Sequence, residues 1–490
     1  MLDILIVNVG NIRKKVYQEL SDNFSAIEPP FWAALTAGFI RKSGYSVEIL
    51  DANAYNYSHK EATKIIEEKN PRFVAIIVFS QQANTCSPIM ESVIELCDEI
   101  KKSNKDRVVI VSGWHPSALP QRTMEEVECN YIIVGEGFHA YVDLLKNKET
   151  GEILGLWYRD KGVIRNNQEP ELIGNLEKEL SDVAWDLLPL NKGLYRAFNW
   201  LCLNDLESRD KCATIYTSLG CPYHCTFCAI HSSFKSNRVR YWSPEWVVKQ
   251  LSHLYHTYGI KNINLLDEIF ILKPDHYLKV AEGIINEKLP LNICAFARVD
   301  IINKIPINNL AVLKRAGVNW IKLGIESIQP EILEGVNKGI YDGEASRNVV
   351  KKLHDAGIDI CANFMFGLPG DTWDSMQGSL NFAYSLNCSF PSFFCTMAPP
   401  GSELFERASE LGLKLPDTWG GYAQQGYDFL PLSTDTLSAK EILAFRDYAF
   451  TAYFSNPRYL HMIELKFGKK ARTHIEKMTK ISLKRKILTE

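Results

Sequence analysis

Three cysteines in one short segment, Cys221, Cys225 and Cys228, are the residues of this chain that could most readily do chemistry. They follow the apolar run 212–217, which predicts a short buried strand, so they are expected on the loop just past a strand end. Thiolates are the usual ligands of iron–sulfur clusters. A cubane cluster holds four irons and the segment offers three thiolates, so one iron would be left for a ligand that is not protein.

The same cysteines could instead have a purely structural role. A structural zinc knuckle needs a fourth Cys or His ligand, and His224 or His231 could supply it. The cysteines could also be unrelated residues of a hydrophobic core. The polar residues expected elsewhere in the chain favour the iron–sulfur interpretation.

The composition is that of a globular protein with two or three domains. The chain has 490 residues, 46% of them hydrophobic, and a formal net charge of −3 with both signs interspersed. With charges of both signs interspersed, the sequence shows no overall excess of basic residues of the kind that binds nucleic acid. The twelve cysteines are scattered among apolar residues, which is unlike a secreted disulfide framework and indicates a reducing cytoplasm. The first residues do not look like a signal peptide, and no apolar run is long enough to span a membrane.

In residues 1–145, strands alternate with helices. Apolar strand patterns at 2–9, 45–50, 73–79, 108–111 and 131–134 are separated by helical segments. This alternation predicts an α/β fold with a doubly wound, Rossmann-like parallel sheet, which binds ligands at the carboxyl ends of its strands. The small or polar residues expected at these strand ends are Ser80, Ser112, Gly113, Gly135 and Glu136.

Residues 146–205 are expected to link this domain to the next. The segment is charged and rich in turn formers as far as about residue 179. Within it, 153–158 and 162–165 could form a small hairpin. Trp185 is interpreted as a packing anchor between the two domains.

Residues 206–410 predict a second parallel structure. After the cysteine loop, strands at 263–266, 293–297, 320–323, 359–364 and 392–397 alternate with helices. With the strand before Cys221 they make six units, so a partial (β/α)6 TIM-type barrel is expected rather than a closed barrel of eight. Chemistry in such barrels takes place at the carboxyl-terminal strand ends. The residues expected there are Asp267, Glu268, Arg298, Glu326, Ser327 and Gly367.

Residues 411–490 predict a mostly helical tail, with helices at about 438–454 and 459–467. The aromatic residues Trp419, Tyr422 and Tyr427 could form a lid over the barrel or could simply pack. The basic run 480–486 is expected to be a solvated helix end, and Lys338 in the barrel domain a solvated lysine.

The spacing C-x3-C-x2-C, with Phe227 before the last cysteine, resembles the signature of the radical S-adenosylmethionine (SAM) superfamily. The resemblance implies a [4Fe-4S] cluster whose open iron binds SAM, and reductive cleavage of SAM to a 5′-deoxyadenosyl radical. It places Asp267 and Glu268 near the amino group of SAM, with a helix cap as the alternative. Arg298 would pair with the SAM carboxylate or with Asp300. By the same resemblance, Glu326 and Ser327 would contact ribose and carboxylate, and Gly367 would border the adenine.

The first domain resembles the cobalamin-binding domain of class B radical SAM enzymes. Ser112-Gly113-Trp114-His115-Pro116 stands where that family shows Gly-Gly-x-His-Pro, and Gly135-Glu136-Gly137 matches its Gly-Glu-Gly/Glu element. The resemblance implies bound cobalamin. Two features depart from the pattern: the D-x-H-x-x-G signature is absent, and Ser112 replaces a glycine. His115 could bind cobalt or pack at a strand-end turn, and Glu136 could contact the ligand or stabilise a helix start.

The function implied is methylation of an unactivated carbon of a small-molecule substrate through methylcobalamin, with reduced flavodoxin or ferredoxin as electron donor. Ring closure or rearrangement without methyl transfer is the alternative within the same architecture. RNA methylthiolation is disfavoured because Cys86, Cys97 and Cys129 lack motif context and the charge is not basic. A non-catalytic cobalamin or redox sensor would not need the SAM site that the strand-end motifs indicate.

Overall fold

The computed structural model describes residues 2–80 and 82–489. Its first sheet has seven strands in the order β2-β1-β3-β4-β5-β6-β7, and β1 to β5 are parallel. The bounds are β1 Ile4–Asn8, β2 Val47–Asp51, β3 Phe73–Val78, β4 Val108–Gly113 and β5 Tyr131–Ile133. Strand β3 is buried along its whole length, as expected for a central strand covered on both faces. The doubly wound sheet predicted from the sequence is confirmed.

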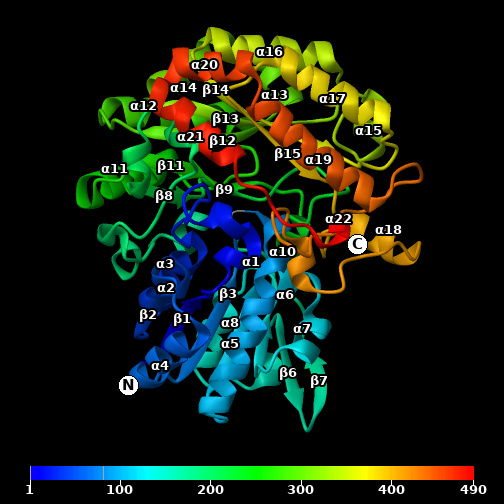
Figure 1. Ribbon diagram of the computed structural model, residues 1–490. Coiled ribbons are helices and arrows are strands. Elements are labelled where there is room, and N and C mark those ends of the chain that lie inside the picture. The colour runs from blue at the N-terminus through cyan, green and yellow to red at the C-terminus, as the bar shows by residue number, and fades with distance from the viewer. Residues whose placement is uncertain (1, 81, 490) are drawn as a thin grey trace.

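Helices cover both faces of this sheet (Figure 1). Helices α2 (Phe31–Lys42) and α8 (Phe138–Leu145) pack together, as do α4 (His59–Lys69) and α5 (Met90–Ser103). Helix α4 begins at a capping box, in which Ser58 and Glu61 satisfy each other's backbone N–H groups. Helix α2 is buried along nearly its whole length because the second domain and the linking segment lie against it.

The segment expected to be a linker supplies two strands of the first sheet. Strands β6 (Leu156–Asp160) and β7 (Val163–Asn166) form the expected hairpin, and β6 pairs antiparallel with β5. Beyond it, Trp185 donates a hydrogen bond of 2.9 Å from Nε1 to Gln250 of the second domain. Its ring lies 5.7 Å from that of Phe31, so it anchors the two domains as predicted.

The second sheet is a six-stranded, fully parallel barrel segment in the order β15-β14-β13-β12-β11-β8. Its strands are β8 Cys212–Ile215, β11 Asn262–Leu265, β12 Asn292–Arg298, β13 Val318–Glu326, β14 Asp359–Phe366 and β15 Phe390–Cys395. The longer helices between them are α11 Pro244–Tyr258, α12 Pro274–Asn286, α14 Ile307–Arg315, α16 Gly343–Asp355 and α17 Trp373–Leu386. The partial (β/α)6 barrel is therefore confirmed. A short hairpin, β9 (Ser218–Leu219) with β10 (Arg240–Tyr241), flanks the cysteine loop.

Helix α18 (Glu403–Glu410) ends the barrel domain, and the helical tail that follows comprises α19 Ala439–Phe454, α20 Pro457–Phe467, α21 Lys469–Thr479 and α22 Lys486–Thr489. Helices α19, α20 and α21 lie on the barrel, and the chain then returns to the junction between the domains (Figure 1). The prediction of a solvated basic end is wrong for Arg485. Its side chain is 1% exposed, because Asp447 and the carbonyl groups of Gln424 and Gly426 satisfy its guanidinium.

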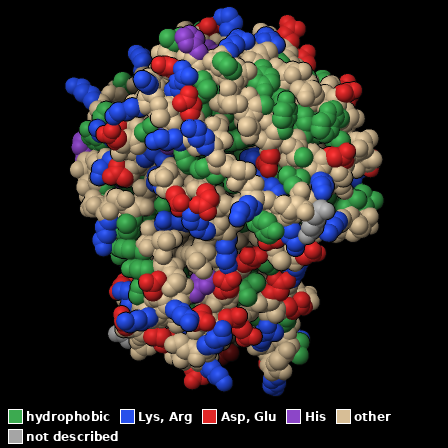
Figure 2. Space-filling model, viewed as in Figure 1, with side chains coloured by type: hydrophobic (Ala, Val, Ile, Leu, Met, Phe, Trp, Pro, Cys, Tyr) green, Lys and Arg blue, Asp and Glu red, His purple; other side chains and the backbone are tan. Residues whose placement is uncertain are grey.

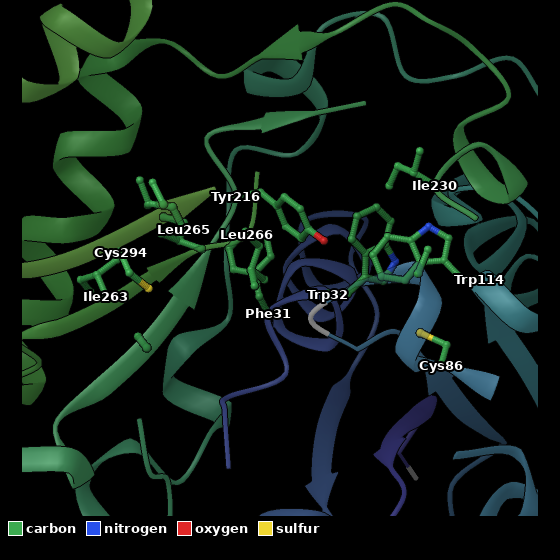
Figure 3. Packing of buried hydrophobic residues seen from close by; sticks show 14 of the residues in the cluster. Phe31, Trp32, Cys86, Trp114, Tyr216, Ile230, Ile263, Leu265, Leu266 and Cys294 are labelled. Atoms are coloured by element: carbon green, nitrogen blue, oxygen red, sulfur yellow. The ribbon is translucent and has the colours of Figure 1, made fainter. Parts of the chain in front are cut away.

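Aromatic side chains fill part of the junction between the two domains. Trp32 stacks on Phe79 with ring centroids 4.2 Å apart. Trp114 packs against Phe79, and Phe234 lies 6.2 Å from both Trp32 and Trp114. Figure 3 shows Tyr216 and Trp114 on the two sides of Trp32, with Phe31 and Leu266 nearby. The carboxyl-terminal strand ends of both sheets meet across this layer, because Phe79 follows β3 and Tyr216 follows β8.

Candidate functional site

The cysteine loop leaves the barrel at a glycine that no other residue could replace without strain. Gly220 has φ +104°, and a Cβ there would lie 2.5 Å from the carbonyl oxygen of Arg238. The turn directs Cys221, Cys225 and Cys228 away from the end of β9. The cysteine loop expected after a strand end is therefore present.

Both domains hold this loop by hydrogen bonds. Within the barrel domain, the N–H of Thr226 donates to the carbonyl of Val336 at 3.1 Å, and Leu404 N–H donates to the carbonyl of Thr226 at 2.8 Å. From the first domain, the Asn84 amide donates to the carbonyl of Phe227 at 3.1 Å and accepts from the N–H of Ala229 at 2.9 Å. Asn84 thus fixes the backbone on both sides of Cys228.

The thiols lie partly exposed against an apolar wall that includes Phe227, Leu368 and Ala398. Burial raises the pKa of the Cys221 thiol to about 12 and that of Cys228 well above its usual range. A metal must therefore displace the protons, as thiolate ligation normally requires. Three soft donors on one loop, without a fourth donor beside them in the part of the chain that the structure describes, fit a cluster with one open iron.

The geometry does not support the zinc alternative. His231 Nε2 donates to the carbonyl of Tyr223 at 2.8 Å, and the rings of His224 and His231 stack on each other 4.4 Å apart. Among residues 2–80 and 82–489, no three His, Cys, Asp or Glu side chains lie close enough to share one ion. The histidines therefore stabilise the loop itself.

Arg298, at the end of β12, places a cation beside the thiols. Its Nη1 lies 3.5 Å from Cys225 Sγ, and its guanidinium carbon lies 3.8 Å above the ring of Tyr223. Its Nε also donates to Asp300 at 2.9 Å. The structural Arg–Asp pair, one of the two alternatives for Arg298, is therefore present, and the guanidinium also faces the cluster loop.

Two neighbouring carboxylates after β11 are in different situations. Both oxygens of Asp267 accept hydrogen bonds, from the N–H and hydroxyl of Thr217 and from the hydroxyl of Ser218, at 2.5 to 2.9 Å. Glu268 makes no such bonds among the described residues, and burial raises its pKa to about 7. Lys322 opposes this rise in pKa through its positive charge. Glu268 is thus the carboxylate of the two that remains able to meet a cationic ligand.

Glu326, at the end of β13, has an unusual backbone. Its φ is +61°, and the sheet register shifts between Gly324 and Glu326. Such strain in a non-glycine residue is concentrated at functional sites. Glu326 Oε1 pairs with Lys338 Nζ at 2.8 Å, and both side chains are 9% exposed. The prediction that Lys338 is solvated is therefore wrong, because it neutralises this buried carboxylate.

Ser327 and Gly367 occupy structural turns next to the site. The Ser327 hydroxyl accepts from the N–H of Gln329 at 3.2 Å. Gly367 has φ +79°, and a Cβ there would lie 2.7 Å from Ile442 of α19, so the glycine lets the tail approach the barrel. Thr372 caps α17 in a capping box, and Asp371 accepts from the N–H of Leu368 at 3.0 Å within the preceding turn.

At the edge of the first sheet, Ser80, Ser112 and Gly113 lie at strand ends as predicted. The Ser112 hydroxyl is 2.6 Å from that of Tyr141, and the Ser80 N–H lies 3.3 Å from Cys86 Sγ. Gly113 has φ +134°, and a Cβ would come within 2.2 Å of the Val78 carbonyl. A glycine is therefore required here by the backbone of β3.

His115 is a buried, neutral histidine. Its Nδ1 lies 2.9 Å from the hydroxyl of Ser87, and its ring meets that of Trp419 edge-on at 4.3 Å. Burial lowers its pKa to about 3. Trp419 also donates to Glu126 at 2.6 Å, so the aromatic tail segment packs on the first domain. Of the two possible roles of that segment, packing is the one observed for Trp419.

Glu136 forms a buried ion pair that joins the domains. Both of its oxygens accept from Arg240, at 2.6 and 3.0 Å, and Oε2 also accepts from the N–H of Ile173 at 2.9 Å. The two charged side chains are 5% and 3% exposed. Beside the pair lies a cavity of about 380 Å³ bounded by Gly135, by residues 169–174 and by residues 233–240.

The residues at this junction fit a large polar cofactor. Trp114 Nε1, Ser233 Oγ and Arg240 Nε are buried without a hydrogen-bond partner among the described residues. Such groups are costly unless a ligand or water satisfies them. The amide and phosphate oxygens of a corrinoid are suitable acceptors, and a Cβ at Gly135 would make only van der Waals contact, at 3.7 Å from the carbonyl oxygen of Ser233.

Sequence reasoning missed three residues that connect the parts of this site: Asn84, Arg240 and Lys322. Asn84 follows a predicted strand end, where a polar loop residue is a candidate contact. Arg240 and Lys322 have no local signature, since their partners are distant in the sequence.

Comparison with known proteins agrees with these features. Residues 215–383 match the Radical SAM superfamily, and residues 20–145 match the B12 binding domain. The chain is 30% identical over 399 residues to the "Uncharacterized methyltransferase PH0819" of Pyrococcus horikoshii, covering 80% of this chain and 81% of that protein. It is 24% identical over 446 residues to the anaerobic magnesium-protoporphyrin IX monomethyl ester cyclase of Rubrivivax gelatinosus, covering 88% and 75%.

The fold is also that of a solved structure, the radical SAM methyltransferase TsrM from Kitasatospora setae with cobalamin and a [4Fe-4S] cluster bound. The TM-score is 0.70 at 16% identity, and the alignment covers 98% of this chain and 99% of that one. The chain belongs to the cobalamin-binding radical SAM enzymes.

Proposed function

We propose that this enzyme methylates an unactivated carbon of a small-molecule substrate, using a [4Fe-4S] cluster, SAM and cobalamin. The observation that carries the proposal is the contact between the two sets of strand ends. Asn84, after β3, bonds to the loop of the cluster cysteines, and Glu136, after β5, bonds to Arg240 beyond that loop. The two ligand-binding edges therefore face one reaction space.

When bound, the cluster and SAM supply a 5′-deoxyadenosyl radical, and methylcobalamin supplies a methyl group. We assign the cluster to Cys221, Cys225 and Cys228. Glu268 would accept hydrogen bonds from the amino group of SAM, because it is the uncommitted carboxylate at its strand end. Arg298 would orient the SAM carboxylate while screening the thiolate of Cys225.

The remaining residues position these groups and limit access of water. Glu326, held by Lys338, and the turn residues Ser327 and Gly367 would border the nucleoside part of SAM. Phe227 supplies part of the apolar wall behind the thiols. Asp267 would act indirectly by fixing Thr217 and Ser218.

For the corrinoid, Ser80, Ser112, Gly113, Gly135 and Glu136 would form the edge on which it lies. His115 would support that edge through Ser87 rather than bind cobalt, because its ring is enclosed by Trp419. We propose residues 1–145 as the cobalamin domain, 146–205 as the connection that completes its sheet, 206–410 as the barrel and 411–490 as the helical tail.

The surroundings of the protein are consistent with a reducing compartment. All twelve cysteines lie in the described ranges and are free thiols. Charges of both signs are interspersed on the face seen in Figure 2, without a single-sign patch suited to nucleic acid. In the described ranges, no helix has the length and apolar character that crossing a bilayer requires. We propose the cytoplasm as the location and reduced flavodoxin or ferredoxin as the electron donor.

Anaerobic reconstitution with iron, sulfide and cobalamin tests the function. With SAM carrying a trideuterated methyl group and a mixture of small metabolites, we expect 5′-deoxyadenosine and a product heavier by the labelled methyl group. Failure to form 5′-deoxyadenosine after reduction would contradict the proposal and favour a sensor.

Cyclisation or rearrangement is the second candidate, favoured by the similarity to a protein named as a cyclase. It predicts 5′-deoxyadenosine and a changed substrate without deuterium. The same experiment therefore separates the two chemistries.

A further inference from the structure

The interior of the barrel is an open cup. Toward the carboxyl ends of β12, β14 and β15, inner-face side chains are partly exposed although these strands lie under helices: Phe296, Asn363, Met365, Ser392 and Phe394. Deeper on the same face, Cys294 and Cys361 are buried. The alternate residues on the same strands are buried. Side chains therefore do not fill the interior at these levels, and it remains accessible from the mouth of the barrel.

The other end of the cup is closed. Trp320 on β13 is fully buried, and its ring packs against those of Trp200 and Phe467. Asn292 links Asn262 and Asn319 by hydrogen bonds of 2.8 and 3.0 Å at the start of three strands. The described residues therefore close this end of the cup, and the cluster cysteines lie at the opposite end.

Lys322 is the cation on the wall of this cup. It aligns with Phe296 on β12 and with Cys361 on β14, so it shares their inner face. Its Nζ donates to Asn264 Oδ1 at 2.6 Å and lies 3.5 Å from the centre of the Phe296 ring. Strand β12 separates β11 from β13, so the bond to Asn264 crosses the concave side of the sheet.

The ammonium group of Lys322 is incompletely satisfied. The side chain is 5% exposed, yet the described residues provide no carboxylate that forms an ion pair with it and only one hydrogen-bond acceptor. An ammonium has three N–H donors, and a buried cation without a counter-charge is destabilising. A methionine of similar size would fill the same space without that penalty.

The acidic groups near the cup attract Lys322 only from a distance: its charge lowers the pKa of Glu268, but no ion pair with Lys322 forms among the described residues. Glu28 accepts from the Asn264 amide at 2.7 Å, so Asn264 stands between Glu28 and Lys322. Glu268 lies nearer the mouth, at the end of β11, and Glu326 is paired with Lys338. Asn363, one level above Lys322 in the register, adds an amide to the same wall.

We propose that the cup binds the substrate through an anionic group, a carboxylate or a phosphate, that pairs with Lys322. This inference rests on the proposed function, because it assumes that the substrate enters the barrel. The Phe296 and Phe394 rings would contact the apolar part of the same molecule, as in most small-molecule sites. The substrate class is thus an acidic metabolite with an apolar body, whose reacting carbon lies toward the cluster.

Binding of simple anions tests the site directly. Acetate and inorganic phosphate would be added separately to the reconstituted enzyme, and the midpoint of thermal unfolding measured. We expect one of them to raise the midpoint by about 2 °C or more in the wild type, and to have no effect on Lys322→Met. The anion that acts distinguishes a carboxylate from a phosphate. Lys351→Met, at an exposed lysine paired with Asp355, is the matched control and should respond like the wild type.

Two outcomes of this titration would overturn the inference. One is an equal response of Lys322→Met and the wild type, which would place the anion elsewhere. The other is the lack of any response to either anion in the wild type.

Turnover gives an independent test. Metabolites fractionated on an anion exchanger would be incubated with the enzyme and deuterated SAM. We expect label only from the retained, acidic fractions, and a loss of at least ~100-fold in labelled product for Lys322→Met, as for truncation of a buried charge pair. Lys351→Met, at the exposed control position, should give the labelled product in the same amount as the wild type. Labelling of a neutral compound would contradict this inference and leave the proposed function intact. Absence of 5′-deoxyadenosine from the wild type would contradict the proposed function itself.

Discussion

Asn84 in the first domain accepts a hydrogen bond of 2.9 Å from the N–H of Ala229, the residue that follows the last cluster cysteine. The same amide donates to the carbonyl of Phe227 on the other side of Cys228. Asn84 lies just after β3, on the edge of the sheet to which we assign the corrinoid. The backbone that carries one thiol is therefore held by the domain that does not contain it.

Replacing Asn84 by alanine should weaken this connection. Two hydrogen bonds are lost, and the peptide groups at 227 and 229 lose their partners, at a cost of about 1–3 kcal/mol. We expect lower iron content after reconstitution and faster loss of iron to a chelator, with normal iron binding for Asn381→Ala at an exposed position. Iron retention equal to the wild type in Asn84→Ala would show that the barrel domain alone fixes the loop.

Each cluster cysteine should be necessary on its own. Alanine at position 221, 225 or 228 leaves two thiolates, so we expect loss of the cluster absorbance and of 5′-deoxyadenosine formation. Cys129→Ala, at a buried cysteine of the first domain, is the control and should keep both. A cluster of unchanged iron content in any of the three variants would refute the ligand assignment.

SAM binding should strengthen as the pH rises through neutrality. Burial raises the pKa of Glu268 to about 7, and the ammonium of SAM requires the carboxylate form. Below the pKa, the affinity should fall up to tenfold per pH unit. The negative charge of a bound cluster would raise the pKa of Glu268 further, so the pH midpoint of SAM binding would be higher. SAM affinity would still increase with pH. Titrations of the reconstituted enzyme between pH 6 and 8 would measure this effect.

The control for this pH dependence is Glu268→Gln, whose SAM affinity should be weaker and nearly independent of pH. The stability of the SAM-free protein should change with pH in the opposite direction to the SAM affinity. Because the folded-state pKa lies above the ordinary value of 4.5, the SAM-free protein should lose stability as the pH rises from about 4.5 through 7. The glutamine variant should not show this loss. A wild-type SAM affinity that stays constant from pH 6 to 8 would remove Glu268 from the SAM site.

The buried pair of Glu136 and Arg240 should stabilise the contact between the domains. Glu136→Gln leaves the guanidinium of Arg240 without a counter-charge, so we expect a loss of about 3–5 kcal/mol and a lower midpoint of thermal unfolding. The double variant Glu136→Leu/Arg240→Met, which leaves no unpaired buried charge, should regain part of the lost stability. For comparison, Asp355→Asn at an exposed pair should change stability by less than about 1 kcal/mol. An equally small effect of Glu136→Gln would contradict the proposed role of the pair.

The architecture was predictable because it follows from local patterns. The apolar strand at 73–79 and the glycine-terminated strand at 108–113 have the periodicity of buried parallel strands, and both are central in the first sheet. The apolar run 212–217 likewise placed the cysteine loop just past a strand end, and only the short strand β9 lies between β8 and the loop. The hairpin at 156–166 was also recognisable, but its attachment to β5 was not, because strand pairing depends on contacts outside the segment.

The roles of individual charged residues were less predictable. Lys338 has the sequence context of a surface turn, yet it is buried against Glu326, twelve residues away. Arg485 stands in a basic run and is nevertheless enclosed by Asp447 and two carbonyl groups. In both cases the partner that makes burial tolerable is contributed by the tertiary fold, which no local pattern encodes.

The C-terminal tail is synthesised last, so its contacts with the barrel and the first domain form after both sheets have been synthesised. Gln424 bonds to the N–H and carbonyl of Cys395 on the outermost barrel strand, and Gln18 of the first domain bonds to the carbonyls of Gln425 and Lys484. During synthesis both sheets can therefore form before these closures exist. This order gives the cell an interval in which iron, sulfide and a bulky corrinoid can be inserted into a nearly finished enzyme.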